Sequence, residues 1–207
     1  MVYKVVVAVV AVLLRILFNF EYYGKDIIES YKTNGRPYVV CPNHISALDP
    51  LFVVVARGKG RKLTVMAKEE LFKNKFLSWF FTQLGAIPVS RGTGDKGVLD
   101  QTINDLKSGA GALIFPEGTR GDGNTMGKLK SGAFAVAAQT GADIIPVRII
   151  YHTKDGNMKL FCKVTVVFGQ PLTIQQTQLD NGQRQQIRLA KGMMEESYTA
   201  MLEEYNK

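Results

Sequence analysis

Residues 38–56 read YVVCPNHISALDPLFVVVA and contain, in order, a short apolar run, a polar turn and a second apolar run. The first run, at 38–41, is short and rich in valine, which predicts a buried strand. Proline is favoured in the first turn of a helix, so Pro50 predicts that a helix covers 50–56. A strand that passes through a turn into a helix is the repeating unit of an α/β fold.

The rest of the chain repeats this alternation. Further short apolar runs predict strands at 63–66, 86–89, 112–115, 144–150 and 161–168. Helices are predicted between them at 75–84, 98–107 and 131–140. The tail at 183–205 predicts a closing amphipathic helix that packs on the domain through Ile187, Met194, Tyr198, Met201 and Tyr205, which recur at helical spacing. We therefore expect one α/β domain with a central mixed sheet flanked by helices.

The composition is that of a folded domain, with 207 residues, of which 46% are hydrophobic and 21% charged. A formal net charge of +8 favours anionic partners such as phosphorylated lipids, nucleotide-bearing cofactors, acidic membranes or nucleic acid. Cys41 and Cys162 have neither the spacing of a metal site nor that of a disulfide framework, so they are expected to be free thiols in a reducing compartment.

The N-terminus is unusually apolar, because residues 5–14 form an unbroken hydrophobic run. A helix over 2–19 would be about 27 Å long, just short of a hydrocarbon core of roughly 30 Å, and it would carry Lys4 and Arg15. An interfacial membrane anchor is therefore favoured over a spanning helix, and a secretion signal is disfavoured because no small-residue cleavage site follows.

We accordingly divide the chain into three parts. Residues 1–22 are expected to form the membrane-associating segment, 23–182 the folded domain and 183–207 the closing helix. Several basic residues follow the helix predicted at 50–56. Attraction to anionic headgroups could come from four of them: Arg57, Lys59, Arg61 and Lys62.

His44 and Asp49 form a candidate base and orienting acid. Side chains five residues apart on a regular helix are rotated by about 140°, so these two can meet only if His44 lies in the turn before the helix. Asp49, just before Pro50, could cap the free helix amides and face back toward His44. In the simpler alternative Asp49 is only a cap and His44 a turn residue. The other histidine, His152, has no acid at comparable spacing.

Two other polar clusters follow predicted strands. GAIPVSR at 85–91 ends in an arginine that could bind a phosphate bidentately, although strand ends often display solvated arginine. FPEGTR at 115–120 could bind a phosphorylated polyol: Gly118 admits close backbone approach, Arg120 supplies charge, and Glu117 could accept hydroxyl protons or hold an arginine. A surface turn is the alternative for this second cluster.

In this order, NHISALDP at 43–50 and FPEGTR at 115–120 resemble the lysophosphatidate acyltransferase (1-acylglycerol-3-phosphate acyltransferase) family, whose hallmark is Asn-His-x-Ser-x-x-Asp-Pro followed by Phe-Pro-Glu-Gly-Thr-Arg. The resemblance extends through GAIPVSR and IIPVRI at 144–149, so it covers roughly residues 36–150. It implies a glycerolipid acyltransferase domain in which His44 is the general base and Asp49 orients it. It also implies that the glycerophosphate of the acceptor is bound by Arg91, Glu117, Gly118, Thr119 and Arg120.

The resemblance further implies the reaction and its location. The acyl group of acyl-CoA or acyl carrier protein would be transferred to the sn-2 hydroxyl of 1-acylglycerol 3-phosphate, giving phosphatidate for phospholipid synthesis without a metal or other cofactor. The enzyme would be monotopic or peripheral on the cytoplasmic face of the cell membrane and would contact an anionic lipid surface. In AKEEL at 67–71, Lys68 is a candidate to stabilise the oxyanion, with a surface ion pair as the alternative.

Several alternatives stay open at this point. A related acyltransferase could use glycerol 3-phosphate or another lysophospholipid, and a thioesterase would release thiol without an acceptor. A covalent route through Ser46 or Cys41 lacks a Gly-x-Ser-x-Gly elbow. A non-catalytic membrane-surface or nucleic-acid-binding module could use the basic segment 57–75 and the aromatic residues of 76–81, but no nucleic-acid motif accompanies them, so lipid is the better partner.

Overall fold

The computed structural model describes residues 2–58, 60, 62–89, 96–123, 126–174 and 181–206, and it contains one seven-stranded sheet. The strands are β1 (Asn19–Tyr23), β2 (Tyr38–Pro42), β3 (Leu63–Lys68), β4 (Ala86–Val89), β5 (Gly111–Leu113), β6 (Asp143–Tyr151) and β7 (Lys163–Phe168). The helices are α1 (Val2–Leu17), α2 (Lys25–Asn34), α3 (Asp49–Arg57), the short 3₁₀ helix η1 (Glu69–Phe72), α4 (Lys75–Gln83), α5 (Lys96–Lys107), α6 (Gly132–Thr140) and α7 (Asn181–Tyr205).

The sheet is mixed, with the strand order β1-β7-β6-β2-β5-β3-β4. All neighbouring strands are parallel except β6 and β7, which are antiparallel. β2 lies between β5 and β6, and Val40 pairs with Leu113 on one side and Ile145 on the other. This confirms the expected α/β fold with a central mixed sheet, and it brings the carboxyl ends of β2, β5 and β6 to one edge.

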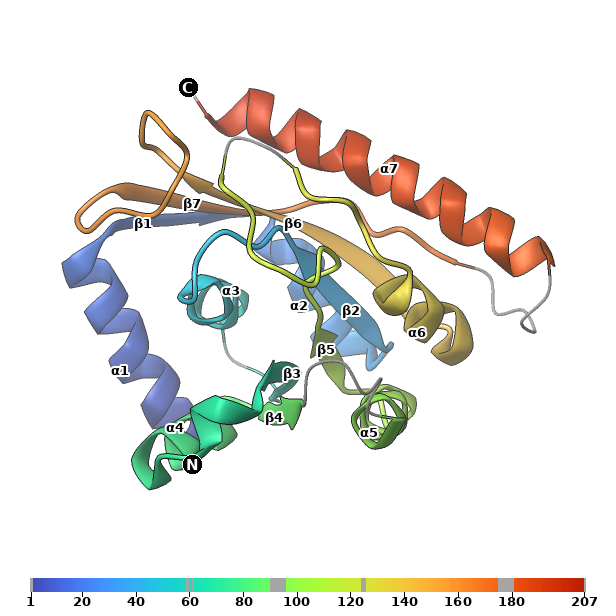
Figure 1. Cartoon of the computed structure of the whole chain (residues 1–207), viewed down its shortest axis with the longest axis horizontal. Coiled ribbons are helices and arrows are strands. Elements are labelled where there is room, and N and C mark those ends of the chain that lie inside the picture. Colours follow the sequence, from blue (N-terminus) through green and yellow to red (C-terminus); the bar gives the residue numbers. More distant parts are fainter. Residues whose placement is uncertain are drawn as a thin grey trace.

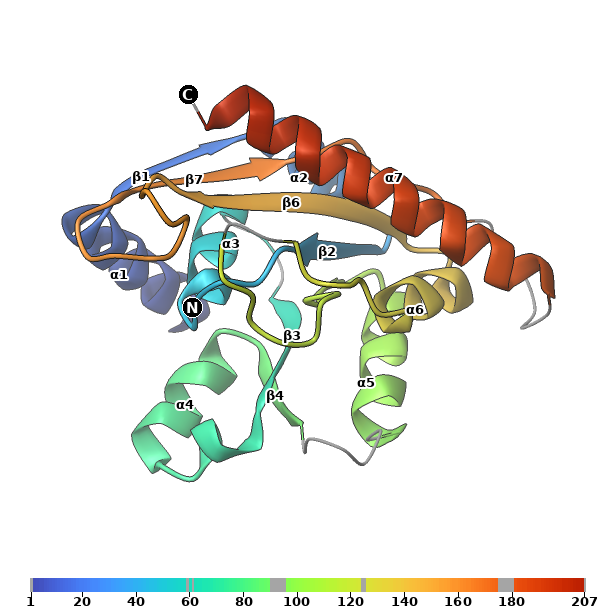
Figure 2. The ribbon, with the colours of Figure 1, turned by 45° about the horizontal axis from the view of Figure 1, so that its top comes forward.

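Helices cover both faces of the sheet (Figures 1 and 2). The alternation of a strand sends successive side chains to opposite faces, so Val40 of β2 packs in the core under α1, α2 and α3. Its neighbours Val39 and Cys41 pack in the second core, which α5, α6 and α7 cover. Each face of β2 is thus fully buried, which explains why the strand is a continuous apolar run.

The closing helix packs as its spacing predicts. Met194 and Tyr198 of α7 are fully buried against the second face of the sheet, and Ile187 and Tyr205 are partly buried there. The Tyr198 hydroxyl donates a 2.7 Å hydrogen bond to the main-chain oxygen of Cys41. This contact fixes α7 directly to β2, the strand that leads to His44.

The N-terminal region differs most from expectation. α1 ends at Leu17, and residues 19–23, partly assigned above to a membrane segment, form the edge strand β1 parallel to β7. Phe20 of this strand packs on Phe52 with ring centroids 5.1 Å apart. The sequence NFEYY has no clear alternation, so neither β1 nor the following α2 was predicted.

α1 is apolar on most of its surface, and its charged residues are the exposed Lys4 and Arg15. One stripe, formed by Tyr3, Val6, Val10 and Leu14, is buried in the core. Six large apolar side chains outside this stripe are exposed: Val2, Val5, Val9, Val12, Leu13 and Ile16. Among the described residues, no helix is both long enough and apolar enough to cross a bilayer.

Candidate active site

The turn between β2 and α3 is anchored to β6 through Asn43. The Asn43 side chain is 3% exposed and forms two hydrogen bonds with the backbone of Ile149: its amide nitrogen donates to the Ile149 oxygen at 3.1 Å, and its oxygen accepts from the Ile149 nitrogen at 2.6 Å. A side chain that satisfies both backbone groups of a neighbouring strand holds the start of the turn in one position.

His44 and Asp49 meet across this turn. The His44 Nδ1 atom lies 2.9 Å from Asp49 Oδ2. The same carboxylate oxygen accepts the backbone amides of Ile45 at 2.6 Å and Ser46 at 2.8 Å. Asp49 is the first residue of α3, with Leu48 as the N-cap, so its carboxylate faces the preceding turn. The expectation that Asp49 caps the helix amides is therefore wrong, because the amides it binds belong to the turn.

Tyr151, at the end of β6, completes the surroundings of Asp49. Its hydroxyl donates to Asp49 Oδ1 at 2.5 Å, and the carboxylate is 0% exposed. Burial, together with the adjacent Asp49 carboxylate, raises the pKa of Tyr151, so this hydroxyl stays protonated and acts as a donor. Sequence reasoning missed this residue; the only signal was a hydroxyl-bearing aromatic directly after the predicted strand 144–150.

The network determines which nitrogen of His44 can act as a base. Because two amides and a hydroxyl already donate to Asp49, the carboxylate acts as an acceptor and the His44 Nδ1 is its fourth donor. In the neutral ring the lone pair then lies on Nε2, for which the described residues provide no hydrogen-bond partner. The ring stacks on Phe115, with centroids 4.0 Å apart, and its side chain is 19% exposed.

Glu117 joins the His44 turn to the loop that follows β5. Its Oε1 accepts the backbone amide of His44 at 2.9 Å, and its Oε2 accepts that of Gly127 at 3.1 Å. The side chain is 6% exposed, and the Gly121 amide donates to the His44 carbonyl at 2.8 Å. Both carboxylate oxygens are thus engaged with backbone, which favours a positioning role over direct contact with the acceptor.

The neighbouring residues of this loop are open to solvent. Gly118, Thr119 and Arg120 are all exposed. Gly118 has a φ of +69°, and a Cβ atom built on it would lie 2.6 Å from Lys130 Nζ, so glycine allows the close approach of this lysine. Lys130 was not predicted, and it adds a cation beside Gly118, in the loop that also carries Arg120.

The sequence offered three further candidates, Lys68, Arg91 and His152. Lys68, at the end of β3, forms a 2.8 Å ion pair with Glu70, and both side chains are about half exposed, which is the surface-pair alternative. Arg91 lies outside the described residues. His152 contacts Thr165 Oγ1 at 2.8 Å, away from any acid of the site.

The covalent alternative gains no support. Cys41 is fully buried in β2, and this burial raises the pKa of its thiol. Ser46 is 6% exposed, and its oxygen accepts the amide of Leu48 at 3.2 Å. Over the described residues, no group of three or more His, Cys, Asp and Glu side chains is arranged to hold a metal ion.

Comparison with known proteins gives a consistent family. A model of the family described as Acyltransferase matches residues 19–150. The chloroplastic 1-acyl-sn-glycerol-3-phosphate acyltransferase LPAT1 of Arabidopsis thaliana is 32% identical over 136 residues, which are 65% of this chain and 37% of that protein. The 1-acyl-sn-glycerol-3-phosphate acyltransferase of Streptococcus pneumoniae is 31% identical over 172 residues, which are 80% of this chain and 60% of that protein. The chain thus spans less than two thirds of either relative.

A solved structure shares the fold. The crystal structure of the 1-acyl-sn-glycerophosphate acyltransferase PlsC from Thermotoga maritima superimposes with a TM-score of 0.72 at 21% sequence identity. The superposition covers 98% of this chain and 79% of that chain.

Proposed function

Because the chain belongs to the acyltransferase family, we propose that it transfers a fatty acyl group from a thioester to the sn-2 hydroxyl of a 1-acylglycerol 3-phosphate. The observation that carries this proposal is the His44 ring, which is held through Nδ1 by a fully buried carboxylate. The donor is acyl-CoA or acyl carrier protein, and the product is phosphatidate.

The chemistry follows from the protonation of His44. Its Nε2 removes the proton of the acceptor hydroxyl while the hydroxyl oxygen attacks the thioester carbonyl, giving a tetrahedral oxyanion. Collapse of this intermediate re-forms the carbonyl, breaks the carbon–sulfur bond and expels the thiolate, which takes the proton from His44. Asp49 fixes the ring and stabilises its transient positive charge. A positioned base of this kind contributes ~10²- to 10⁴-fold.

We assign acceptor binding to the exposed loop. Arg120 and Lys130 supply positive charge beside Gly118, and the Thr119 hydroxyl can bind a phosphate or glycerol oxygen. Arg91 remains part of this proposal from the family motif alone. For Lys68 we retain the oxyanion role that the family resemblance implies. The contact that the structure gives its ammonium group is the ion pair with Glu70.

The test is an acceptor-dependent transfer assay. Purified protein is incubated with lysophosphatidate and either acyl-CoA or acyl carrier protein carrying an acyl chain, and the diacyl product is identified by mass. We expect phosphatidate only when donor and acceptor are both present. Thiol release at the same rate without acceptor would instead identify a thioesterase, and product formed only from glycerol 3-phosphate would assign a different acceptor.

The proposed acceptor resides in a bilayer, and we propose that the exposed side of α1 contacts it at the cytoplasmic face of the cell membrane. Val9 and Ile16 are 54% and 66% exposed, and Lys4 and Arg15 lie exposed on the same helix. α1 packs against α4, on which Phe76 is 68% exposed (Figure 1). Exposed apolar and basic side chains on adjoining helices favour an anionic lipid surface.

The basic residues predicted to support this contact need one correction. Arg57 is 1% exposed, and its Nε donates to the Tyr38 hydroxyl at 2.7 Å, so it cannot reach a headgroup. Lys59 and Arg61 lie outside the described residues. Lys62 remains a candidate beside Tyr3 of α1.

Substitutions can test membrane contact without removing the buried stripe of α1. Val9→Gln combined with Ile16→Gln should strongly weaken flotation with vesicles of phosphatidylcholine and phosphatidylglycerol, since both side chains are exposed, the core is untouched and no positive charge is added. Leu189→Gln on α7, where the side chain is 62% exposed, is the matched control and should float normally. Equal flotation of the double variant and the control would exclude this side of α1 as the membrane contact.

A further inference from the structure

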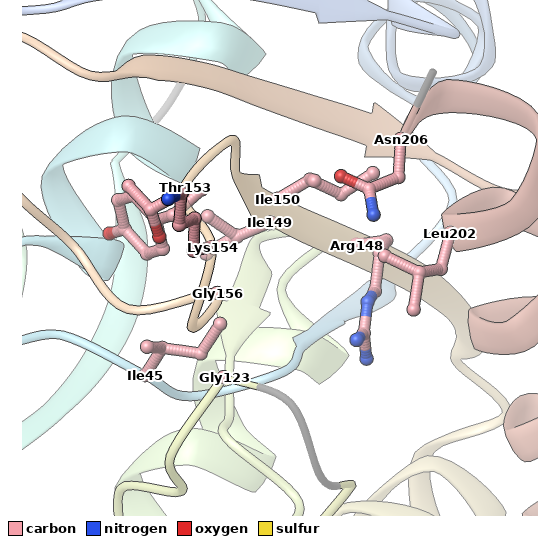
Figure 3. Close-up of a pocket in the computed structure, with 11 residues that line it drawn as sticks. Ile45, Gly123, Arg148, Ile149, Ile150, Thr153, Lys154, Gly156, Leu202 and Asn206 are labelled. Carbon is pink, nitrogen blue, oxygen red and sulfur yellow. The ribbon is translucent and has the colours of Figure 1, made fainter.

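A polar cavity of approximately 130 Å³ lies behind the His44 turn, between β6, the loop after β5 and the C-terminal end of α7 (Figure 3). Its lining residues come from four separate segments of the chain. They include Ile45, Gly123, Arg148, Lys154, Leu202 and Asn206. A water molecule occupies ~30 Å³ in the liquid, so this volume is large enough for one tetrahedral oxyanion or a few waters.

Arg148 is the distinctive group in this cavity. It extends from β6 beside Leu202 and Asn206 (Figure 3), and it is 5% exposed. Its guanidinium carbon lies 5.8 Å from the Tyr198 ring, yet its buried Nε has no hydrogen-bond partner among the described residues. A buried cation with an unsatisfied donor is destabilising unless another group compensates for it.

Within the part of the chain that the structure describes, no acidic residue lines the cavity. Lys154 contributes a second cation. Burial is the main influence on the pKa of Arg148 and lowers it, and the charge of Glu117 opposes this effect. However, each oxygen of Glu117 accepts a backbone amide, from His44 or from Gly127, and neither forms a hydrogen bond with the Arg148 Nε.

We propose that this cavity binds a single phosphate-sized oxyanion, with Arg148 as its buried anchor and Lys154 as a second charge at its edge. The same chemistry could be supplied by free inorganic phosphate or by the phosphate group of a lipid. The site is separate from the exposed residues 118–120 assigned to the acceptor, and it does not depend on the proposed catalytic function.

A bound anion would add a further connection between the loop after β5, β6 and the C-terminal end of α7. Gly123 belongs to the loop that carries Thr119 and Arg120, and its backbone packs against that of Gly156 in the β6–β7 connection. Tyr151, which also lines the cavity, is the donor to Asp49. Occupancy should therefore stabilise the fold around the active site, since a ligand that binds only the folded chain raises its stability by mass action.

The experiment measures thermal unfolding of the full chain in inorganic phosphate and in chloride at matched ionic strength, with phosphate affinity determined by calorimetric titration. We expect phosphate to raise the Tm of the wild-type protein above its value in chloride. Arg148→Met should weaken phosphate binding by at least about tenfold. It should also be no less stable than wild type in chloride, because it removes a buried, incompletely paired charge.

A second pair of variants tests the proposal even if Arg148→Met does not fold. Lys154 is exposed, so Lys154→Gln should fold and weaken phosphate binding roughly threefold or more. Lys159→Gln, in the same connection but outside the cavity, should bind phosphate as wild type does. Stabilisation of wild type by neither inorganic phosphate nor short-chain lysophosphatidate, or phosphate binding that is equally tight in wild type, Arg148→Met and Lys154→Gln, would overturn the proposal.

A parallel arm with short-chain lysophosphatidate identifies the source of the anion. Stabilisation of wild type by inorganic phosphate assigns the site to a free oxyanion. If only lysophosphatidate stabilises the protein, and Arg148→Met removes that effect, the site binds a lipid phosphate. Stabilisation by lysophosphatidate that persists in Arg148→Met, with no effect of inorganic phosphate, would overturn the proposal.

Discussion

The turn that holds His44 and the loop that carries Arg120 meet at the same edge of the sheet, yet they are built differently. The Asp49 carboxylate in the turn is fully buried and accepts four hydrogen bonds. In the loop, Gly118, Thr119 and Arg120 are exposed. We infer that the two regions have different roles: the buried network fixes the base, and the exposed residues bind the acceptor. Substitutions in the two regions should therefore change different quantities.

The largest effect should come from the reactive end of the buried network. His44→Ala removes the base and should lower kcat by ~10²- to 10⁴-fold. The fold should survive, because the ring is partly exposed and Asp49 keeps its other donors. Steady-state kinetics and a circular dichroism melt of the same preparation provide the measurement. A folded variant with near-normal kcat would remove His44 from the mechanism.

Glu117 belongs to the buried network and Arg120 to the exposed loop, although they are three residues apart. Substituting each one tests the difference between the two regions within one motif. Glu117→Gln places an amide NH₂ against a backbone N–H, so it should lower the free energy of unfolding by ~1–3 kcal/mol and reduce kcat through the displaced His44 turn. Arg120→Ala should leave unfolding unchanged and raise the KM for lysophosphatidate about tenfold or more.

Urea unfolding and kinetics on lysophosphatidate and on an uncharged monoacylglycerol separate these two outcomes. The loss for Arg120→Ala should be confined to the phosphate-bearing acceptor. If both variants change KM alone, Glu117 contacts the acceptor directly and the proposed division between the regions is wrong.

Tyr151→Phe should have the smallest effect on turnover. It removes one donor from Asp49 Oδ1, while the amides of Ile45 and Ser46 still hold Oδ2. We expect the free energy of unfolding to fall by ~1–3 kcal/mol and kcat to fall only a few-fold. A loss of kcat as large as that of His44→Ala would show that the hydroxyl takes part in the reaction itself.

Sequence reasoning succeeded where the relevant residues are contiguous. Residues 43–50 contain Asn43, His44, Asp49 and the proline that sets the helix start, so their relation could be inferred from local geometry. Tyr151 and Phe115 reach the same site from β6 and from the segment after β5, and their arrival depends on the order β5-β2-β6. Nothing in a single sequence specifies that order.

The N-terminus shows a second limit. Apart from Lys4 and Arg15, residues 2–17 are apolar, so hydrophobicity alone could not distinguish the stripe that enters the core from the apolar side that stays exposed. β1 was missed because Glu21 interrupts its apolar residues, and its position next to β7 is a long-range pairing. The side chains of an edge strand are only partly buried, so its sequence shows a weak alternation of apolar and polar residues.

The most direct test of the buried network is a double-mutant cycle of His44→Ala and Asp49→Asn, with kcat measured on lysophosphatidate and folding checked for each variant. If Asp49 acts through His44, Asp49→Asn should lower kcat strongly in the wild-type background and cause no further loss once His44 is absent. Losses that multiply in the double variant would contradict this mechanism, because they would require Asp49 to contribute independently of the histidine it contacts.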